Sequence, residues 1–173
     1  MSKVIVFNIK SNLGSYNRPQ SNNNPSTYYI IPKSAIVGII GAVIGLDREF
    51  MKTNNMYELL TNKIMYSIRL CSPFQIKSWS EYGYNHANAI ERPNHPSATP
   101  SKLERLVDVN YDVYLMYDEN DNDVKALLNN FTENIKANLF VFPPYLGMAN
   151  HHADIEFIGE YDSIPCSGKF ITP

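Results

Sequence analysis

Cationic and aromatic residues gather between Lys10 and Lys33, in a pattern that suits the binding of a phosphate backbone. Lys10 precedes a polar loop containing Arg18, and Lys33 precedes a glycine-rich segment. If that segment is a helix, its free amide donors and its dipole attract an anion, and nearby cations strengthen the attraction for phosphate. The same loop carries aromatic rings on which unpaired bases could stack: Tyr16, Tyr28 and Tyr29. An ordinary polar loop, with its tyrosines folded onto the core, explains the same residues.

Imidazole and carboxylate groups near the end of the chain resemble a metal site. His151, His152 and Asp154 lie close together in the sequence. Adjacent residues of an extended segment point to opposite faces, and no second ligand cluster with recognisable spacing accompanies them. We therefore expect no metal and no other cofactor. A metal-dependent hydrolase built on these three residues remains an alternative, which metal analysis of the purified protein would test.

A second pair of histidines allows a different alternative, a metal-independent endoribonuclease. His86 and His95 lie in a long irregular segment with several cations, and either could act with Tyr16 or Tyr28 as general acid and base. The spacing shows no fixed pairing of base and nucleophile. A loop that grips RNA or a neighbouring protein needs the same residues without catalysis. We expect binding rather than cleavage.

Hydrophobic periodicity indicates the elements that position these groups. Alternation of apolar and polar residues predicts strands at 4–9, 63–70, 75–84 and 107–115, and a last strand around 155–158. Helical spacing predicts an amphipathic helix over 124–135 and a glycine-rich helix that begins at Lys33 or Ser34, with Ser34 as its cap. Residues 85–101 contain three prolines and no periodicity, which predicts an irregular insertion.

Without the insertion, the order of elements is strand, helix, strand, strand, helix, strand. This order predicts an α+β fold of the ferredoxin-like or RNA-recognition-motif-like type, with an antiparallel sheet and two helices on one face. Many functions occur on this fold, so it decides none of them.

The glycine-rich helix carries a stripe of bare backbone. Gly38, Gly41 and Gly45 fall on one helical face, and each interior glycine costs about 1 kcal/mol against alanine. Something must therefore approach closely, either another element of the domain or a ligand. The apolar run is shorter than the roughly 20 residues that cross a membrane.

Composition narrows the class of protein. The chain has 173 residues, a net charge of −2 and two cysteines. Its length suits one domain, which we assign to residues 1–173. The slight negative charge argues against holding long nucleic acid by bulk electrostatics, so RNA binding needs a local cluster and partner proteins. The absence of a signal peptide predicts the cytoplasm, where the thiols stay reduced.

Three segments resemble the opening of the fifth CRISPR-associated (Cas) protein family, and most closely its type I-B form. They are residues 6–10, 27–32 and 36–46, and the shorter runs Leu103–Leu106 and Pro144–Gly147 also match. The resemblance implies an RNA-recognition-like core that caps the five-prime handle of the CRISPR RNA in the Cascade complex. It also implies contacts to the backbone subunit and to the large subunit.

The resemblance also assigns the remaining segments. Residues 85–101 would form a thumb-like insertion, and residues 160–173 a short carboxyl-terminal extension. Relatives of the type I-C branch that cleave precursor RNA use a tyrosine just after the glycine-rich helix and an adjacent lysine and histidine. Gly45 and Leu46 occupy the first region here, and the chain contains no adjacent Lys-His pair. The resemblance therefore implies a subunit without catalytic activity.

Together, the residues and the resemblance predict where the handle binds. We expect Gly38 to face the ligand and Gly45 to serve packing. The predicted RNA-binding residues form two groups around the amino end of the glycine-rich helix. They are Lys10, Asn12, Arg18, Tyr28, Lys33, Gly38 and Gly41 in the first group, and Tyr145, Leu146, Gly147 and Met148 in the second.

Overall fold

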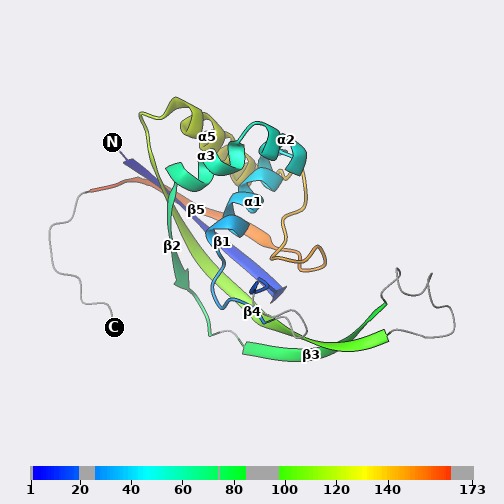
Figure 1. The fold of residues 1–173 in the computed structure, drawn as a ribbon. Helices are drawn as coiled ribbons and strands as arrows, with labels where there is room; N and C mark the ends of the chain where they lie inside the picture. The colour runs from blue at the N-terminus through cyan, green and yellow to red at the C-terminus, as the bar shows by residue number, and fades with distance from the viewer. Residues whose placement is uncertain (1, 20–25, 74, 85–97, 165–173) are drawn as a thin grey trace.

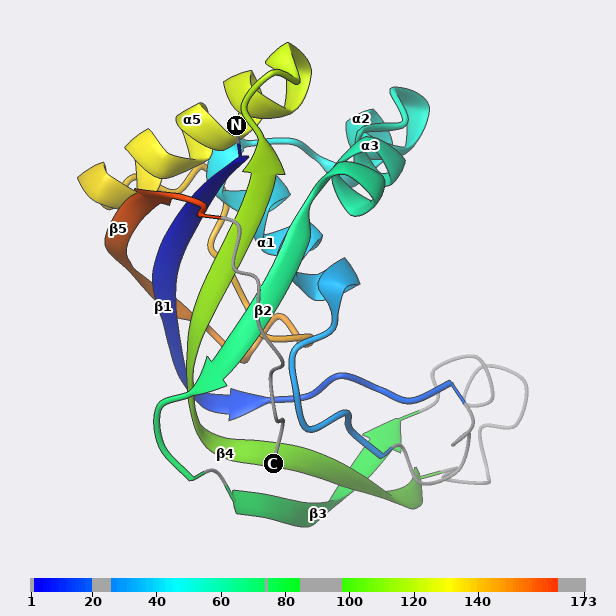
Figure 2. The same ribbon diagram turned by 90° about the vertical axis from the view of Figure 1, so that its left-hand side faces the viewer.

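An antiparallel sheet forms the centre of the computed structural model, which describes residues 2–19, 26–73, 75–84 and 98–164 (Figure 1). The strands are β1 (Ser2–Gly14), β2 (Met65–Leu70), β3 (Gln75–Tyr84), β4 (Ala98–Asp118) and β5 (Asp154–Asp162). Four of them lie in the order β2-β4-β1-β5 (Figure 2). With β3 set aside, this is the order of a ferredoxin-like sheet, as the sequence predicts.

The hairpin of β3 and β4 extends this sheet at one end. β3 pairs with the first half of β4, from Tyr84 opposite Ala98 to Gln75 opposite Val107. The hairpin projects beyond the other strands in Figure 1. The predicted irregular insertion is thus wrong for residues 98–101, which belong to β4. Its other part, residues 85–97 of the expected thumb, lies outside the described residues, as do residues 165–173 of the expected extension.

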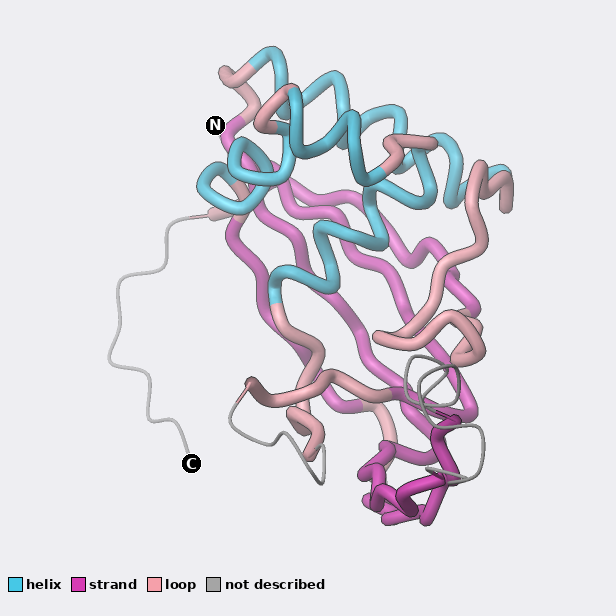
Figure 3. Tube along the Cα trace, turned by 45° about the vertical axis from the view of Figure 1, so that its right-hand side comes forward, coloured by secondary structure: helices cyan, strands magenta, loops and turns pink. Residues whose placement is uncertain are grey.

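Two long helices cover one face of the sheet, as Figure 3 shows. They are α1 (Lys33–Ile44) and α5 (Asn122–Ala137). Alternate residues of a strand point to opposite faces, so β1 turns Ile5, Phe7 and Ile9 toward the helices. Phe7 meets Phe131 of α5 edge to face, with ring centroids 5.3 Å apart. The predicted amphipathic helix and its apolar stripe are confirmed.

Two short helices, α2 (Arg48–Thr53) and α3 (Met56–Lys63), follow α1. The sequence analysis missed both, because neither carries a long apolar period. Local capping defines α2 instead, since the Asp47 side chain accepts a hydrogen bond from the Phe50 backbone N–H at 2.7 Å. Lys63 ends α3, so the predicted strand at 63–70 begins two residues too early; the observed strand β2 begins at Met65. No helix in the described part of the chain combines the length and the apolar character required to cross a bilayer.

Candidate RNA-binding site

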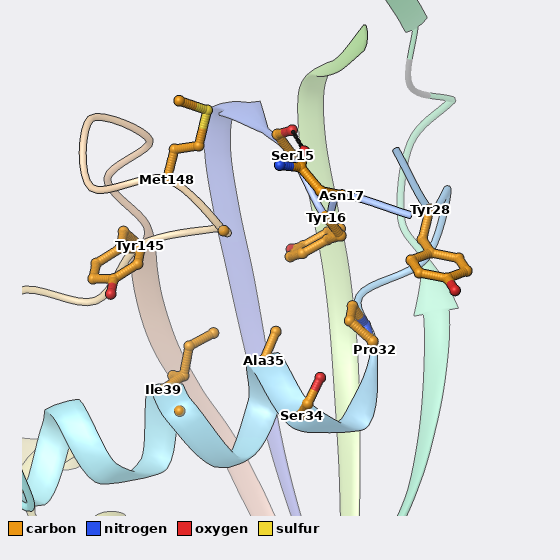
Figure 4. A pocket seen from close by; sticks show the side chains of 12 residues that line it. Ser15, Tyr16, Asn17, Tyr28, Pro32, Ser34, Ala35, Ile39, Tyr145 and Met148 are labelled. Carbon is orange, nitrogen blue, oxygen red and sulfur yellow. Dashed lines mark hydrogen bonds between the residues drawn. The ribbon is translucent and has the colours of Figure 1, made fainter. Parts of the chain in front are cut away.

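A pocket of about 630 Å³ lies beside the amino-terminal half of α1. Three segments contribute its lining: the residues after β1, the approach to α1 with its first turns, and the loop between α5 and β5 (Figure 4). The lining residues are Ser15, Tyr16, Asn17, Tyr28, Pro32, Ser34, Ala35, Gly38, Ile39, Tyr145, Gly147 and Met148. None of these side chains carries a formal charge, so the pocket offers aromatic faces and neutral hydrogen-bonding groups.

Backbone hydrogen bonds hold the three segments together. The N–H of Ser15 donates to the carbonyl of Leu146 at 3.1 Å, which joins the end of β1 to the loop before β5. The N–H of Tyr28 donates to the carbonyl of Tyr16 at 2.9 Å, which joins the end of β1 to the approach to α1. These backbone connections hold the pocket walls together, and buried side chains add to them.

Thr27 is buried and holds the segment that leads to α1 in place through hydrogen bonds. Its hydroxyl accepts a hydrogen bond from the Tyr16 N–H at 2.9 Å and donates to the Tyr28 carbonyl at 3.0 Å. Its backbone N–H donates to the Glu104 carboxylate of β4 at 3.3 Å. The Tyr111 hydroxyl, also from β4, donates to the carbonyl of Tyr29 at 3.0 Å. β4 therefore anchors the segment that presents Tyr28 to the pocket.

The loop between α5 and β5 requires glycine at position 147. Gly147 has φ of 85°, which lies in the left-handed region. A Cβ atom at this position would lie 1.6 Å from the backbone oxygen of Ser15. Glycine at this position therefore permits both the positive φ and the close approach of this loop to the end of β1.

The amino end of α1 opens toward the pocket. Pro32 occupies the cap position and no side chain caps the helix, so the predicted capping by Ser34 is wrong. Pro32 instead accepts backbone hydrogen bonds from Ala35 and Ile36 through its carbonyl. Within the described residues, the N–H groups of Lys33 and Ser34 have no hydrogen-bond partner. Two donors and the positive end of the helix dipole therefore remain available to an anion.

The predicted cations divide between two places. Lys33 begins α1, and the Arg18 guanidinium carbon lies 5.3 Å from the ring centre of Tyr28 and 5.1 Å from that of Tyr29. These two residues border the pocket without lining it. Lys10 lies elsewhere: with Ile9 facing the helices, Lys10 points to the opposite face of the sheet and pairs with Glu156 at 3.6 Å. The expectation that Lys10 faces the amino end of α1 is wrong.

Two other residues predicted to bind RNA do not line the pocket. Asn12 is exposed on β1 outside the pocket lining, whereas Leu146 is fully buried. The sequence analysis did not select Ser15, Asn17, Ser34, Ala35 or Ile39 as binding residues. The isolated bridge between Asn17 and Thr27 brings Asn17 into the wall, and that pairing has no signature in the sequence. The available signal was the short run Ser15–Asn17, which directly follows β1 and contains two polar residues.

The glycine stripe of α1 serves two purposes. Gly38 lines the pocket, and a Cβ atom there would meet nothing within 4 Å. A Cβ atom on Gly41 would lie 2.7 Å from the sulfur of Met51, so α2 occupies the space over this residue. Gly45 ends the helix with φ of 81° and lies against Val141. Only Gly38 of the three offers open backbone.

An apolar groove of about 620 Å³ adjoins the pocket, with Gly38 and Tyr145 on the edge that both share. Its lining comes from α1, from α2 with the turn before it, from Tyr57 of α3 and from the segment before Tyr145, and includes Met51 and Phe142. The exposed residue Gly38 therefore borders both hollows. A ligand in the pocket therefore has an apolar surface next to it.

The catalytic and metal alternatives find little support in the geometry. The described residues contain no group of three or more potential metal ligands, and His151 is buried while His152 is exposed. Tyr16 is also buried, and burial raises the pKa of its hydroxyl well above the usual range. A buried phenol with a raised pKa makes a poor general base. His86 and His95 lie outside the described residues.

Comparison with solved structures shows the same fold in other chains. A CRISPR-associated protein superposes with a TM-score of 0.52 at 12% identity, over 90% of this chain and 66% of the other. A CRISPR RNA-guided surveillance complex contains a chain that superposes with a TM-score of 0.55 at 12% identity, over 85% of this chain and 58% of that one. A functionally uncharacterized protein from Streptococcus mutans gives 0.50 at 14% identity, over 90% and 66%.

These matches define what the chain shares with the proteins it resembles. It spans at most 66% of the length of the three matched chains. No curated protein sequence is significantly similar to it. The family model described as CRISPR-associated protein (Cas_Cas5) matches residues 4–161, which is nearly the whole described chain. The chain therefore belongs to the CRISPR-associated protein (Cas_Cas5) family.

Proposed function

We propose that the chain is a non-catalytic, RNA-binding subunit of a type I CRISPR effector complex, the Cascade complex, in which it caps the five-prime handle of the CRISPR RNA. The observation that carries the proposal is the uncharged, tyrosine-lined pocket at the open amino end of α1. Membership of the Cas_Cas5 family supports it. The proposal includes contacts to the backbone subunit and to the large subunit of that complex.

The pocket offers the interactions that single-stranded RNA needs. Tyr28 and Tyr145 are 40% and 47% exposed, so each has ring surface on which a base can stack. Asn17 and Ser34 supply neutral donors and acceptors for the edges of a base, while the Ser15 hydroxyl orients Asn17 by donating to its amide oxygen at 3.2 Å. The free N–H groups at the start of α1 and the neighbouring Lys33 favour a phosphate. One nucleotide therefore finds a stacking surface, an edge contact and a phosphate contact in one place.

The same lining favours binding over catalysis. General acid and base chemistry needs two titratable groups within hydrogen-bond reach of the reacting atoms. The pocket lining contains tyrosines but no histidine, lysine or carboxylate. The endoribonuclease alternative would therefore need groups from outside the described residues or from a partner.

Co-expression tests the proposal directly. The chain, carrying an affinity tag, is produced together with the neighbouring effector proteins and a CRISPR array, and the purified complex is examined for RNA. We expect one complex with a processed RNA, and Lys33→Glu to lower RNA retention about tenfold, equivalent to about 1.4 kcal/mol. Lys10→Glu is the matched control, because Lys10 lies on the opposite face of the sheet. We expect it to leave RNA retention nearly unchanged.

Two results would contradict the proposal. Equal RNA retention by the Lys33→Glu and wild-type complexes would place the RNA elsewhere on the chain. Specific cleavage of repeat RNA by the purified chain in the presence of a chelator would establish the endoribonuclease alternative instead.

A further inference from the structure

His151 lies beneath the loop that carries Tyr145 and Met148, outside the pocket itself. Its side chain is only 1% exposed, whereas the next residue, His152, is exposed. The pair that resembles a metal site in the sequence is therefore divided between the interior and the surface. The buried position of His151, against the loop that lines the pocket, suggests a role other than metal binding.

Three hydrogen bonds connect His151 to this loop, which we call the rim loop (Pro144–Met148). The backbone N–H of His151 donates to the carbonyl of Met148 at 2.9 Å, and its carbonyl accepts from the N–H of Leu146 at 2.8 Å. The ring Nδ1 lies 3.3 Å from the carbonyl oxygen of Leu146. That carbonyl also accepts the N–H of Ser15, so the ring bonds to the atom that joins the rim loop to β1.

The hydrogen bond of the ring defines its protonation state. A carbonyl oxygen only accepts, so Nδ1 must carry the hydrogen, and in the neutral ring Nε2 is then a bare acceptor. Nε2 is buried and has no hydrogen-bond partner among the described residues. A second proton would have to bind Nε2, where it would create a buried cation and an N–H donor without an acceptor.

The surroundings of the ring oppose that proton. Burial lowers the pKa of His151 below its ordinary value, the hydrogen bond to the Leu146 carbonyl acts in the other direction, and the charge of Arg105 on β4 lowers it further. Arg105 is the charged group of the described chain that acts on the ring; neither the rim loop nor β1 brings a carboxylate to it. The folded rim loop therefore selects the neutral imidazole.

We propose that His151 is a positioning residue for the pocket, whose neutral ring fixes the rim loop and whose protonation releases it. Tyr145 and Met148 then lose their fixed places in the pocket wall, so ligand binding weakens as the solution becomes acidic. The identity of that ligand, single-stranded RNA, rests on the proposed function. The positioning role itself concerns the chain alone.

Methyl NMR of methionine-labelled full chain tests the positioning role without RNA. The Met148 methyl signal is followed from pH 8 to pH 5 together with the His151 ring signals. We expect the methyl signal to shift with the protonation of His151, at a pH below the ordinary histidine value of 6.5. His152→Asn is the matched control and should leave the titration of Met148 in place. A Met148 signal that does not follow His151 would overturn the proposal.

Two substitutions at position 151 separate positioning from packing. In His151→Asn the amide Nδ2 can replace Nδ1 as the donor to Leu146 but cannot titrate, so we expect a fixed rim loop and a Met148 signal independent of pH. His151→Leu fills similar space without the hydrogen bond and should release the rim loop at every pH. If Leu preserves the wild-type Met148 signal at neutral pH, packing alone fixes the loop and the proposal fails.

RNA retention by the assembled complex gives a separate readout. Between pH 7.5 and pH 5.5 we expect the wild-type complex to lose about threefold in RNA affinity and the His151→Asn complex to show no such loss. If the Met148 signal titrates with His151 but the RNA affinity does not change with pH, the positioning role stands and the proposed RNA site is wrong. The two proposals can therefore fail independently.

Discussion

The two faces of the sheet differ in how their charged and polar groups are paired. On the helix side, the pocket at the amino end of α1 is lined by neutral groups and leaves backbone donors without partners. On the outer face, Lys10 is paired with Glu156 and Arg69 with Asp112. The comparison teaches that the positions of lysine and arginine in the sequence do not show whether their charges are available to an anion, because Lys10 and Arg69 are already paired with carboxylates.

The outer face is built around one buried carboxylate. Asp112 is only 4% exposed and accepts hydrogen bonds from Asn8 Nδ2 at 2.7 Å and Arg69 Nε at 3.0 Å. Asn8 also donates to the Asn110 side chain at 2.8 Å. These side chains satisfy one another across three neighbouring strands. The polar side chains of the outer face thus bond mainly to one another, whereas the pocket walls are joined by backbone hydrogen bonds, with added bonds from buried side chains such as Thr27.

The largest expected effect tests the backbone construction of the pocket. Gly147→Ala would place Cβ against the Ser15 backbone oxygen at a positive φ, and we expect a loss of about 3–4 kcal/mol in the free energy of unfolding. Gly159→Ala, on β5, is the matched control. Its Cβ would meet the hydroxyl end of exposed Tyr161, which can move, so we expect a change within about 1 kcal/mol.

Urea unfolding of both variants measures this difference. Equal stability of the Gly147→Ala and Gly159→Ala proteins would show that the rim loop adapts freely. In that case the pocket wall would not be fixed by its backbone, and the contrast between the two faces would lose its basis.

A smaller effect is expected from the carboxylate of the outer face. Asp112→Asn removes the charge that Arg69 and Asn8 bind, and we expect a loss of about 1–2 kcal/mol in the free energy of unfolding at neutral pH. Glu156→Gln is the control, since Glu156 is exposed in its ion pair with Lys10 and should change stability by less than about 0.5 kcal/mol. RNA retention should survive both substitutions if the pocket holds the RNA.

The pH dependence of unfolding tests the same carboxylate, because its pKa differs between the folded and unfolded chain. Burial would raise the pKa of Asp112, but hydrogen bonds from Asn8, Cys71 and Arg69 outweigh it and lower the pKa below the ordinary value of 3.8. The unfolded chain then binds this proton more readily, so the contribution of Asp112 is complete above about pH 4 and is lost as the pH falls through the folded pKa. Asp112→Asn should flatten that part of the stability profile; an unchanged profile would contradict the assignment.

Much of the fold could be predicted because the responsible signals are local. Alternation identified the strands, and helical spacing identified α5 from residues such as Val124, Leu128 and Phe131. The short helices could not be predicted in the same way, because α2 depends on the cap at Asp47 and packs Met51 over Gly41. That contact is visible only once the two elements are placed together.

The site was less predictable, because it depends on which face each residue takes. Tyr28, Gly38, Tyr145, Gly147 and Met148 were selected from the sequence and do line the pocket. Lys10 was selected because it lies near the loop in the sequence, but the alternation along β1 sends its side chain to the outer face. Applying that alternation to Ile9 and Lys10 would have removed the error.

The smallest expected effect is a gain of stability, and it tests what Gly38 is for. Gly38→Ala adds a methyl group into open space on an interior helical position, so we expect about 0.5–1 kcal/mol of added stability. Gly41→Ala should gain less or lose stability, because its Cβ would displace the buried sulfur of Met51. A glycine at a position where alanine would stabilise the helix is consistent with a ligand that needs the exposed backbone.

Enlarging the side chain at the same position separates stability from binding. Gly38→Leu keeps a good helix former but fills the edge that the pocket shares with the apolar groove. We expect a folded chain with thermal stability at or above that of the wild type, and an effector complex that retains at least about tenfold less RNA. Thermal unfolding and RNA retention measure the two quantities. If the leucine variant retains RNA normally, the RNA does not pass over Gly38, and the open backbone of α1 has no part in binding it.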